Sequence, residues 1–183
     1  MRITISGPPG SGTTTVAKLL ADRLGYKLIS AGEIFRKLAS EKGMTLEEFS
    51  KYAELHPDVD LYIDKLQKEM AEKEENVVVE GRLSGWMIKD AFKVWIHADP
   101  EIRYKRIAQR ENKDLAKVRS ETKRREEIEK RRYKKFYSID LDDLSIYHLI
   151  INSGYFKPDD IVEIILKALN KYIENIKNNK INK

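Results

Sequence analysis

A nine-residue stretch near the amino terminus constrains this chain more than any other feature. Residues 7–15 follow a short apolar strand pattern and precede an amphipathic helix pattern. Gly7, Gly12 and Thr14 fit the template G-x-x-x-x-G-K-[ST], in which backbone N–H groups bind phosphate where a helix begins. The strand, the loop and the helix together therefore predict a phosphate-binding loop (P-loop).

The lysine of that template is replaced by Thr13. The glycines still allow the N–H groups to turn inward, so the loop keeps its backbone donors. Three explanations stay open: Lys18 or an arginine supplies the missing charge, the protein is a slow enzyme, or Thr13 is an engineered substitution. We favour an arginine, because Lys18 lies five residues further along the helix and points away. The residues expected to line the loop are Gly7, Pro8, Pro9, Gly10, Ser11, Gly12, Thr13, Thr14 and Thr15.

Four further strand patterns follow the first one, with helical stretches between them. Their apolar runs are short and nearly continuous, which is typical of parallel strands that are covered on both faces. We therefore expect one α/β domain over residues 1–183, with a parallel sheet flanked by helices and ligands beyond the carboxyl ends of the strands. The expected strands span residues 27–30, 76–80, 93–97 and 147–152.

Two stretches are too long to be simple connections. Residues 33–75 contain several helix patterns, among them a capping box at Thr45 and Glu48, and we interpret them as a helical flap. Residues 100–135 are highly charged, helical in propensity and poor in apolar side chains, as expected of a mobile lid. An amphipathic helix is predicted over residues 159–176, followed by a frayed polar tail.

Composition narrows the functional classes. The chain has no cysteine, which excludes disulfides and thiolate metal sites. Nowhere do eighteen apolar residues follow one another, and no signal peptide pattern opens the sequence, so we expect a cytoplasmic protein with no membrane partner. The net charge is +5, yet residues 101–135 alone carry 15 Lys and Arg against seven Asp and Glu. A basic segment beside a phosphate loop indicates polyanionic ligands, either nucleotides or nucleic acid.

Polar side chains follow two of the expected strands. Glu80 ends one strand and Arg82 comes two residues later, which suits a magnesium contact by the carboxylate and a phosphate contact by the guanidinium. The alternative is an ion pair between these two residues in a loop. Ser30 ends another strand, where it can cap the next helix, and Arg36 on that helix can point back toward an acceptor phosphate.

Arginines are concentrated in the expected lid. Arg103, Arg106 and Arg110 are spaced three and four residues apart, so a helix would place them along one face, and Arg125 follows in the same segment. Phosphoryl transfer needs positive charge around the moving group, which such a face could supply. An exposed surface stripe is an equally good interpretation for any single one of them.

The order of these motifs resembles that of the nucleoside monophosphate kinases over nearly the whole chain. The segments Ser-Ala-Gly-Glu-Ile-Phe-Arg at residues 30–36 and Glu-Gly-Arg at residues 80–82 look most like the archaeal type of cytidylate kinase. So do the stretches at residues 132–140 and 143–145.

The resemblance implies a three-layer P-loop fold with five parallel strands, and transfer of the terminal phosphoryl group of ATP to CMP or dCMP with Mg²⁺. On that basis residues 7–15 bind the phosphates of ATP, and Thr14 and Glu80 serve the metal. Ser30, Arg36 and Arg82 bind the acceptor, and three lid arginines cover the transferring group as catalytic residues. These are Arg106, Arg110 and Arg125.

Alternatives remain for the substrate and for the class of protein. Asp60 and Asp64 could accept a hydrogen bond from a cytosine amino group, but we interpret them as exposed helix charges and leave them out of the site. A different small-molecule P-loop kinase is the closest rival. An RNA-associated P-loop ATPase or binding factor, motivated by the high pI, ranks below it. We expect a monomer that binds nucleotides and no nucleic acid.

Overall fold

The computed structural model describes the backbone of residues 1–181 and the side chains of residues 1–178. Within this part of the chain, five strands form one sheet in the order β2-β3-β1-β4-β5, and each neighbouring pair is parallel. The predicted α/β class and the parallel sheet are therefore confirmed. The strands are β1 (Arg2–Ser6), β2 (Lys27–Ser30), β3 (Val77–Glu80), β4 (Ala91–His97) and β5 (Leu149–Asn152).

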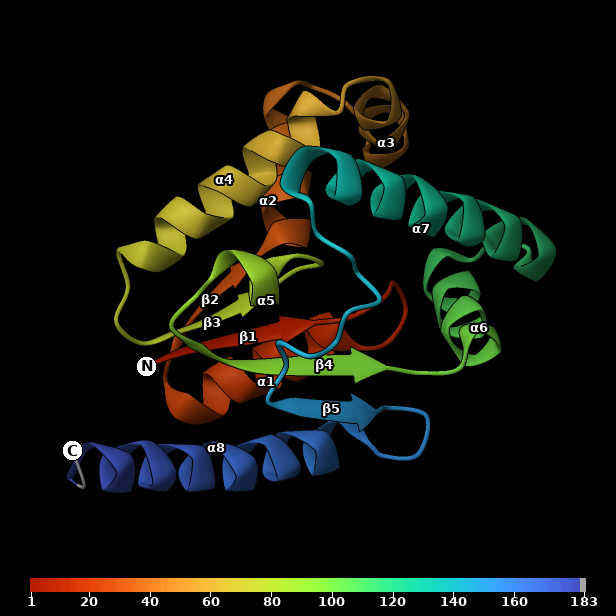
Figure 1. Cartoon of the computed structure of the whole chain (residues 1–183). Coiled ribbons are helices and arrows are strands. Elements are labelled where there is room, and N and C mark those ends of the chain that lie inside the picture. Colours follow the sequence, from red (N-terminus) through yellow and green to blue (C-terminus); the bar gives the residue numbers. More distant parts are fainter. Residues whose placement is uncertain (182–183) are drawn as a thin grey trace.

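Helices connect the strands and cover both faces of the sheet (Figure 1). The sheet and its two helical layers form the three-layer arrangement expected for this motif order. The helices are α1 (Thr13–Leu24), α2 (Ala31–Glu41), α3 (Leu46–Leu55), α4 (Asp58–Glu72), α5 (Ser84–Met87), α6 (Pro100–Glu111), α7 (Leu115–Tyr137) and α8 (Pro158–Ile181).

The core is divided into two parts by the sheet, because successive strand residues point to opposite faces. On one face, Ile3 and Val78 pack against α1 and α8. On the other face, Val77 and Val79 pack against α2, α3 and α4 around the fully buried Phe49. This double coverage explains why the strands lack a polar alternation.

Local sequence signals set the helix boundaries that position the site. Gly12 precedes α1 with a left-handed φ of 94°, and Gly25 ends the same helix with φ 64°. Thr45 and Glu48 form the predicted capping box at the start of α3, and the side chain of Ser30 caps α2. The helical character of residues 33–75 and 100–135 is thus confirmed.

One prediction about the carboxyl terminus was wrong. The final helix does not end at residue 176 but continues to Ile181, and residues 182–183 of the predicted tail lie outside the described residues. In the described part of the chain, no helix combines the length and the apolarity needed to cross a bilayer.

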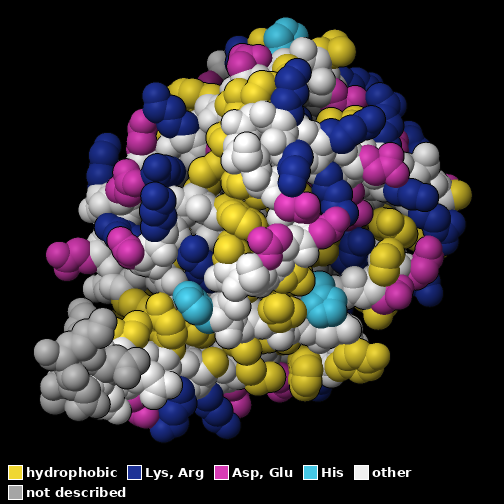
Figure 2. All heavy atoms as spheres, in the orientation of Figure 1, with side chains coloured by type: hydrophobic (Ala, Val, Ile, Leu, Met, Phe, Trp, Pro, Cys, Tyr) yellow, Lys and Arg dark blue, Asp and Glu magenta, His cyan; other side chains and the backbone are white. Residues whose placement is uncertain are grey.

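The long helix α7 spans the molecule from beside α6 to the neighbourhood of α2 and α4 (Figure 1). It therefore passes over the carboxyl ends of the strands. Figure 2 shows Lys and Arg side chains gathered on the upper right of the molecule, over α7, with acidic side chains interspersed among them. The basic segment is thus one long helix that bridges two parts of the fold.

Gly85 offers a test of the packing around α5. A Cβ atom at this position would lie 2.6 Å from the ring of the buried Tyr147. We expect Gly85→Ala to lower the free energy of unfolding by about 1–3 kcal/mol, because the ring must move out of a packed environment. Gly32→Ala is the matched control, since its Cβ would make only ordinary contacts, and its effect should stay within about 1 kcal/mol. Urea denaturation measures both variants, and equal losses would contradict the prediction.

Candidate functional site

The glycine loop lies where β1 ends and α1 begins. Gly10 and Gly12 both adopt left-handed conformations, with φ of 80° and 94°. A Cβ at Gly7 would collide with the carbonyl oxygen of Ile96 in β4, and one at Gly10 would lie 2.6 Å from the carbonyl oxygen of Arg103. The glycines are therefore needed because the loop packs directly against the backbone of two other elements.

Glu80 gathers the hydroxyl groups of the site around one carboxylate. Its Oε1 accepts hydrogen bonds from Thr13 at 2.8 Å and Thr14 at 3.3 Å, and its Oε2 accepts one from Ser30 at 2.7 Å. The Glu80 residue is 7% exposed. Thr13, at the position of the template lysine, is thus bound to the carboxylate of Glu80. The ion pair between Glu80 and Arg82, which the sequence left open, does not form.

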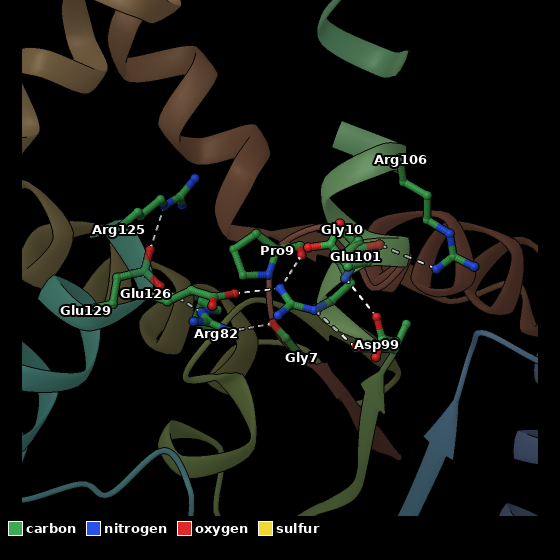
Figure 3. Close-up of polar contacts among 12 residues, drawn as sticks. Gly7, Pro9, Gly10, Arg82, Asp99, Glu101, Arg106, Arg125, Glu126 and Glu129 are labelled. Atoms are coloured by element: carbon green, nitrogen blue, oxygen red, sulfur yellow. Dashed lines mark hydrogen bonds and ion pairs between the residues drawn. The ribbon is translucent and has the colours of Figure 1, made fainter. Parts of the chain in front are cut away.

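Three arginines surround the loop and donate hydrogen bonds to its carbonyl oxygens. Arg82 Nη1 lies 3.1 Å from the oxygen of Gly7, Arg103 Nη1 lies 2.9 Å from that of Pro9, and Arg106 Nη1 lies 3.4 Å from that of Gly10 (Figure 3). These contacts fix the shape of the loop, and the N–H groups where α1 begins are the ones suited to bind an anion. The same contacts place three guanidinium groups at a loop that lacks its lysine, and two of them, Arg82 and Arg103, are also paired with Glu129 and Glu126.

Further bonds fix Arg106 and the loop to the end of β5. Arg106 donates to the hydroxyl of Ser153 at 3.0 Å and to its carbonyl oxygen at 2.8 Å. The same hydroxyl donates to the carbonyl oxygen of Ser11 at 2.6 Å. Sequence reasoning missed Ser153, because it follows an edge strand and no motif marks it.

The remaining predicted arginines differ in their placement. Arg36 is exposed and its Nη1 lies beside Gly32, at the start of α2. Arg110 is exposed and pairs with the adjacent Glu111, so the structure does not bring it to the loop. Arg125 lies on α7 and donates through Nε to Glu129 at 2.7 Å. The catalytic roles of Arg110 and Arg125 stay predictions.

Glu129 is a buried acid that the sequence analysis did not select. Its carboxylate accepts hydrogen bonds from Arg82 Nε at 2.8 Å and from Arg125 Nε at 2.7 Å (Figure 3). Burial raises the pKa of Glu129, but the two guanidinium groups outweigh this effect and bring its pKa to about 2. The spacing of four between Arg125 and Glu129 was the one signal in the sequence, because it predicts a contact on a helix.

The interpretation of Asp60 and Asp64 as exposed helix charges was wrong. Asp64 is 9% exposed, and Asp60 forms an ion pair with Arg132 of α7. The hydroxyl of Tyr137 donates to Asp64 at 3.4 Å. Burial, and then the charge of Asp60, raise the pKa of Asp64 to about 7. The two acids face α7 because this long helix packs against α4, which no local pattern in the sequence could indicate.

Comparison with known proteins decides the family. A family model described as the cytidylate kinase-like family matches residues 2–155. A cytidylate kinase from Archaeoglobus fulgidus is 70% identical over 170 residues, which cover 92% of this chain and 94% of the relative. One from Pyrococcus horikoshii is 48% identical over 91% of this chain and 87% of its own length. This chain belongs to the cytidylate kinase-like family.

Solved structures with low sequence identity to this chain provide a second line of support for the fold. A shikimate kinase from Acinetobacter baumannii matches with a TM-score of 0.64 at 16% identity, covering 93% of each chain. A gluconokinase from Sinorhizobium meliloti matches with a TM-score of 0.62 at 16% identity, covering 96% of this chain and 95% of the other. At such low identity these neighbours show the fold alone, and that fold is the predicted one of the P-loop kinases.

The buried Asp64 predicts a pH-dependent stability. Its pKa is about 7 in the folded protein and near 3.8 when exposed, so the folded state binds the proton more tightly and stability falls as pH rises between these values. The variant Asp64→Asn has no carboxyl group at this position, so it does not lose stability in this way as the pH rises. We expect its free energy of unfolding, relative to the unmodified protein, to improve by about 3–4 kcal/mol between about pH 4 and pH 8.

Urea denaturation across this pH range measures the difference. Glu69→Gln is the matched control, because it removes an exposed acid from the same helix and should show no such trend. A constant difference between Asp64→Asn and the unmodified protein would contradict the raised pKa.

Proposed function

We propose that this protein transfers the terminal phosphoryl group of ATP to CMP, and to dCMP. Membership of the cytidylate kinase-like family, with a relative 70% identical over nearly the full length, supports the reaction and its acceptor. The observation that carries the proposal in the structure is the glycine loop with three arginines bound to its carbonyls. Such a convergence of positive charge is what a transferring phosphoryl group requires.

The loop is the proposed site for the phosphates of ATP. Its inward N–H groups and the start of α1 favour negative charge at this point. Arg103 and Arg106 hold the loop in this shape through Pro9 and Gly10. Because Arg103 is also paired with Glu126, Arg106 is the one of the two that adds charge in place of the missing lysine. Thr13 donates a hydrogen bond to Glu80 and, unlike a lysine, carries no charge that could interact with the phosphates.

The acceptor phosphate is proposed to bind between Arg82 and Arg36. Arg82 is anchored to the loop through Gly7, so a phosphate bound to it lies close to the end of the ATP chain. Arg36 approaches from the start of α2, beside Gly32. Holding both reactants on one rigid sheet edge provides the alignment that in-line transfer needs.

Magnesium fits this site as a partner of the nucleotide phosphates. Within the described residues, no three His, Cys, Asp or Glu side chains are grouped to hold a metal on their own. One carboxylate and one hydroxyl suffice when phosphates and water complete the coordination, and Thr14 and Glu80 lie side by side for this purpose. Held by Thr14 and Glu80, the ion would supply positive charge that neutralises the phosphates of the nucleotide.

Residues 33–75 and 100–135 are proposed to act as flap and lid. Both segments are helical and meet where α7 contacts α3 and α4, through Arg124 with Glu54 and Arg132 with Asp60. Their approach over the loop would exclude water, which would otherwise compete with CMP as the acceptor.

The acceptor is tested by measuring ADP formation from ATP with CMP, dCMP, UMP and AMP in turn. We expect kcat/KM for CMP and dCMP to exceed that for UMP and AMP by about 10-fold or more, as a polar base site can discriminate to that extent. Shikimate and gluconate serve as controls, because the names of the two structural neighbours, a shikimate kinase and a gluconokinase, indicate these hydroxyl acceptors. Higher turnover with either of these, or ATP hydrolysis without any acceptor dependence, would contradict the proposal.

Thr13 provides a second test. If arginines supply the charge, Thr13→Lys should not raise kcat by more than about twofold, since the new ammonium would pair with Glu80. Thr13→Val is the matched control without charge, and loss of one hydrogen bond to Glu80 should lower kcat by about 2- to 10-fold. A gain of an order of magnitude in Thr13→Lys would instead identify a kinase limited by its missing lysine.

A further inference from the structure

Glu129 is a buried carboxylate that has no role in the reaction as proposed above. It lies on α7 and its side chain is 6% exposed. One of its oxygens accepts from Arg125, one helical turn earlier, and the other accepts from Arg82, in the connection that follows β3. A single side chain therefore joins the lid helix to the catalytic edge of the sheet.

The two arginines are held in a way that leaves their ends available. Each one donates its Nε to Glu129, and Arg82 gives one terminal nitrogen to the carbonyl of Gly7. Figure 3 shows the terminal nitrogens of Arg125 pointing away from Glu129, and the Arg125 side chain is 66% exposed. The outer edge of a guanidinium is the part that binds a phosphate in a bidentate manner.

We propose that Glu129 is a positioning residue, which through their Nε atoms orients Arg82 toward the acceptor phosphate and Arg125 toward the transferring phosphoryl group. The inference rests on the proposed function. Two guanidiniums and one carboxylate keep a net positive charge, so the trio still attracts phosphate. Because the arginines are already oriented before the nucleotides arrive, less side-chain freedom is lost on binding.

A purely structural role explains this arrangement less well. Buried ion pairs contribute little to stability compared with apolar residues of the same shape. A structural pair would also need only one arginine, and that arginine would be buried. Glu129 instead holds a second arginine, Arg125, whose side chain is largely exposed.

The variant Glu129→Gln tests the role, because an amide can accept from one guanidinium but opposes the other with its NH₂ group. We expect kcat with ATP and CMP to fall by about 10- to 100-fold, the size of effect that a misplaced catalytic group produces. The KM for ATP should change by less than about threefold, since the glycine loop is untouched. Glu127→Gln, an exposed position on the same helix, should leave kcat unchanged.

A double-mutant cycle with Arg125→Ala separates positioning from stability. If Glu129 acts in part through Arg125, the cost of Glu129→Gln should be smaller in the Arg125→Ala background, and the cost that remains there reflects the loss of the contact with Arg82. The variant Arg125→Lys should not disturb the packing of the core, because the Arg125 side chain is exposed. A lysine has one nitrogen and cannot serve Glu129 and a phosphate together, so its kcat should lie within about threefold of that of Arg125→Ala.

A readout that needs no turnover tests the contacts themselves. The Nε–H signals of Arg82 and Arg125 in NMR spectra should be protected from solvent exchange in the unmodified protein and lose this protection in Glu129→Gln. Absent protection, full kcat in Glu129→Gln, an unchanged cost in the Arg125→Ala background, or wild-type kcat in Arg125→Lys would each overturn the inference. Failure of the unmodified protein to turn over CMP would overturn the proposed function, and the catalytic role of Glu129 with it.

Discussion

The hydrogen bonds between three guanidinium groups and the carbonyl oxygens of the glycine loop are the contacts on which the rest of the site depends. Gly7 and Gly10 pack against β4 and α6 without side chains, so at these two points only the backbone can hold the loop in place. Arg82, Arg103 and Arg106 come from two different connections of the sheet, so they also fix the distance between those connections. The shape of the glycine loop and the position of α6 are therefore set together.

The fold was predictable because its signals are local. The loop glycines, the capping box at Thr45 and the continuous apolar strands each act within a few residues, and they predicted the parallel α/β class and the helical segments, although not the order of the strands. The position of Ser30 as a helix cap followed from the same kind of reasoning. Such signals depend on backbone geometry, which a short stretch of sequence largely determines.

The electrostatics of the site could not be predicted in this way. Asp64 and Glu129 each lie on a helix whose sequence is polar, and both are buried because α7 packs over α4 and the strand ends. Packing between distant segments decides which face of a charged helix meets solvent, and spacing within one helix does not contain that information. The family resemblance supplied roles for the loop and for Arg82, but no residue in its motifs indicated the buried acid between two arginines.

The distribution of arginines shows why net charge is a poor guide to function in this chain. Arg110 and Arg119 of the basic segment are exposed and pair with acids on the surface, where an ion pair contributes little. Arg103 is 5% exposed and reaches the loop from the same helix as Arg110. A buried guanidinium group that lacks hydrogen-bond partners destabilises the folded state. The backbone carbonyls and Glu126 provide those partners for Arg103, and they therefore also fix its position. The part of the basic segment that reaches the glycine loop is thus the part that backbone carbonyls, and for Arg103 also an acid, hold in place.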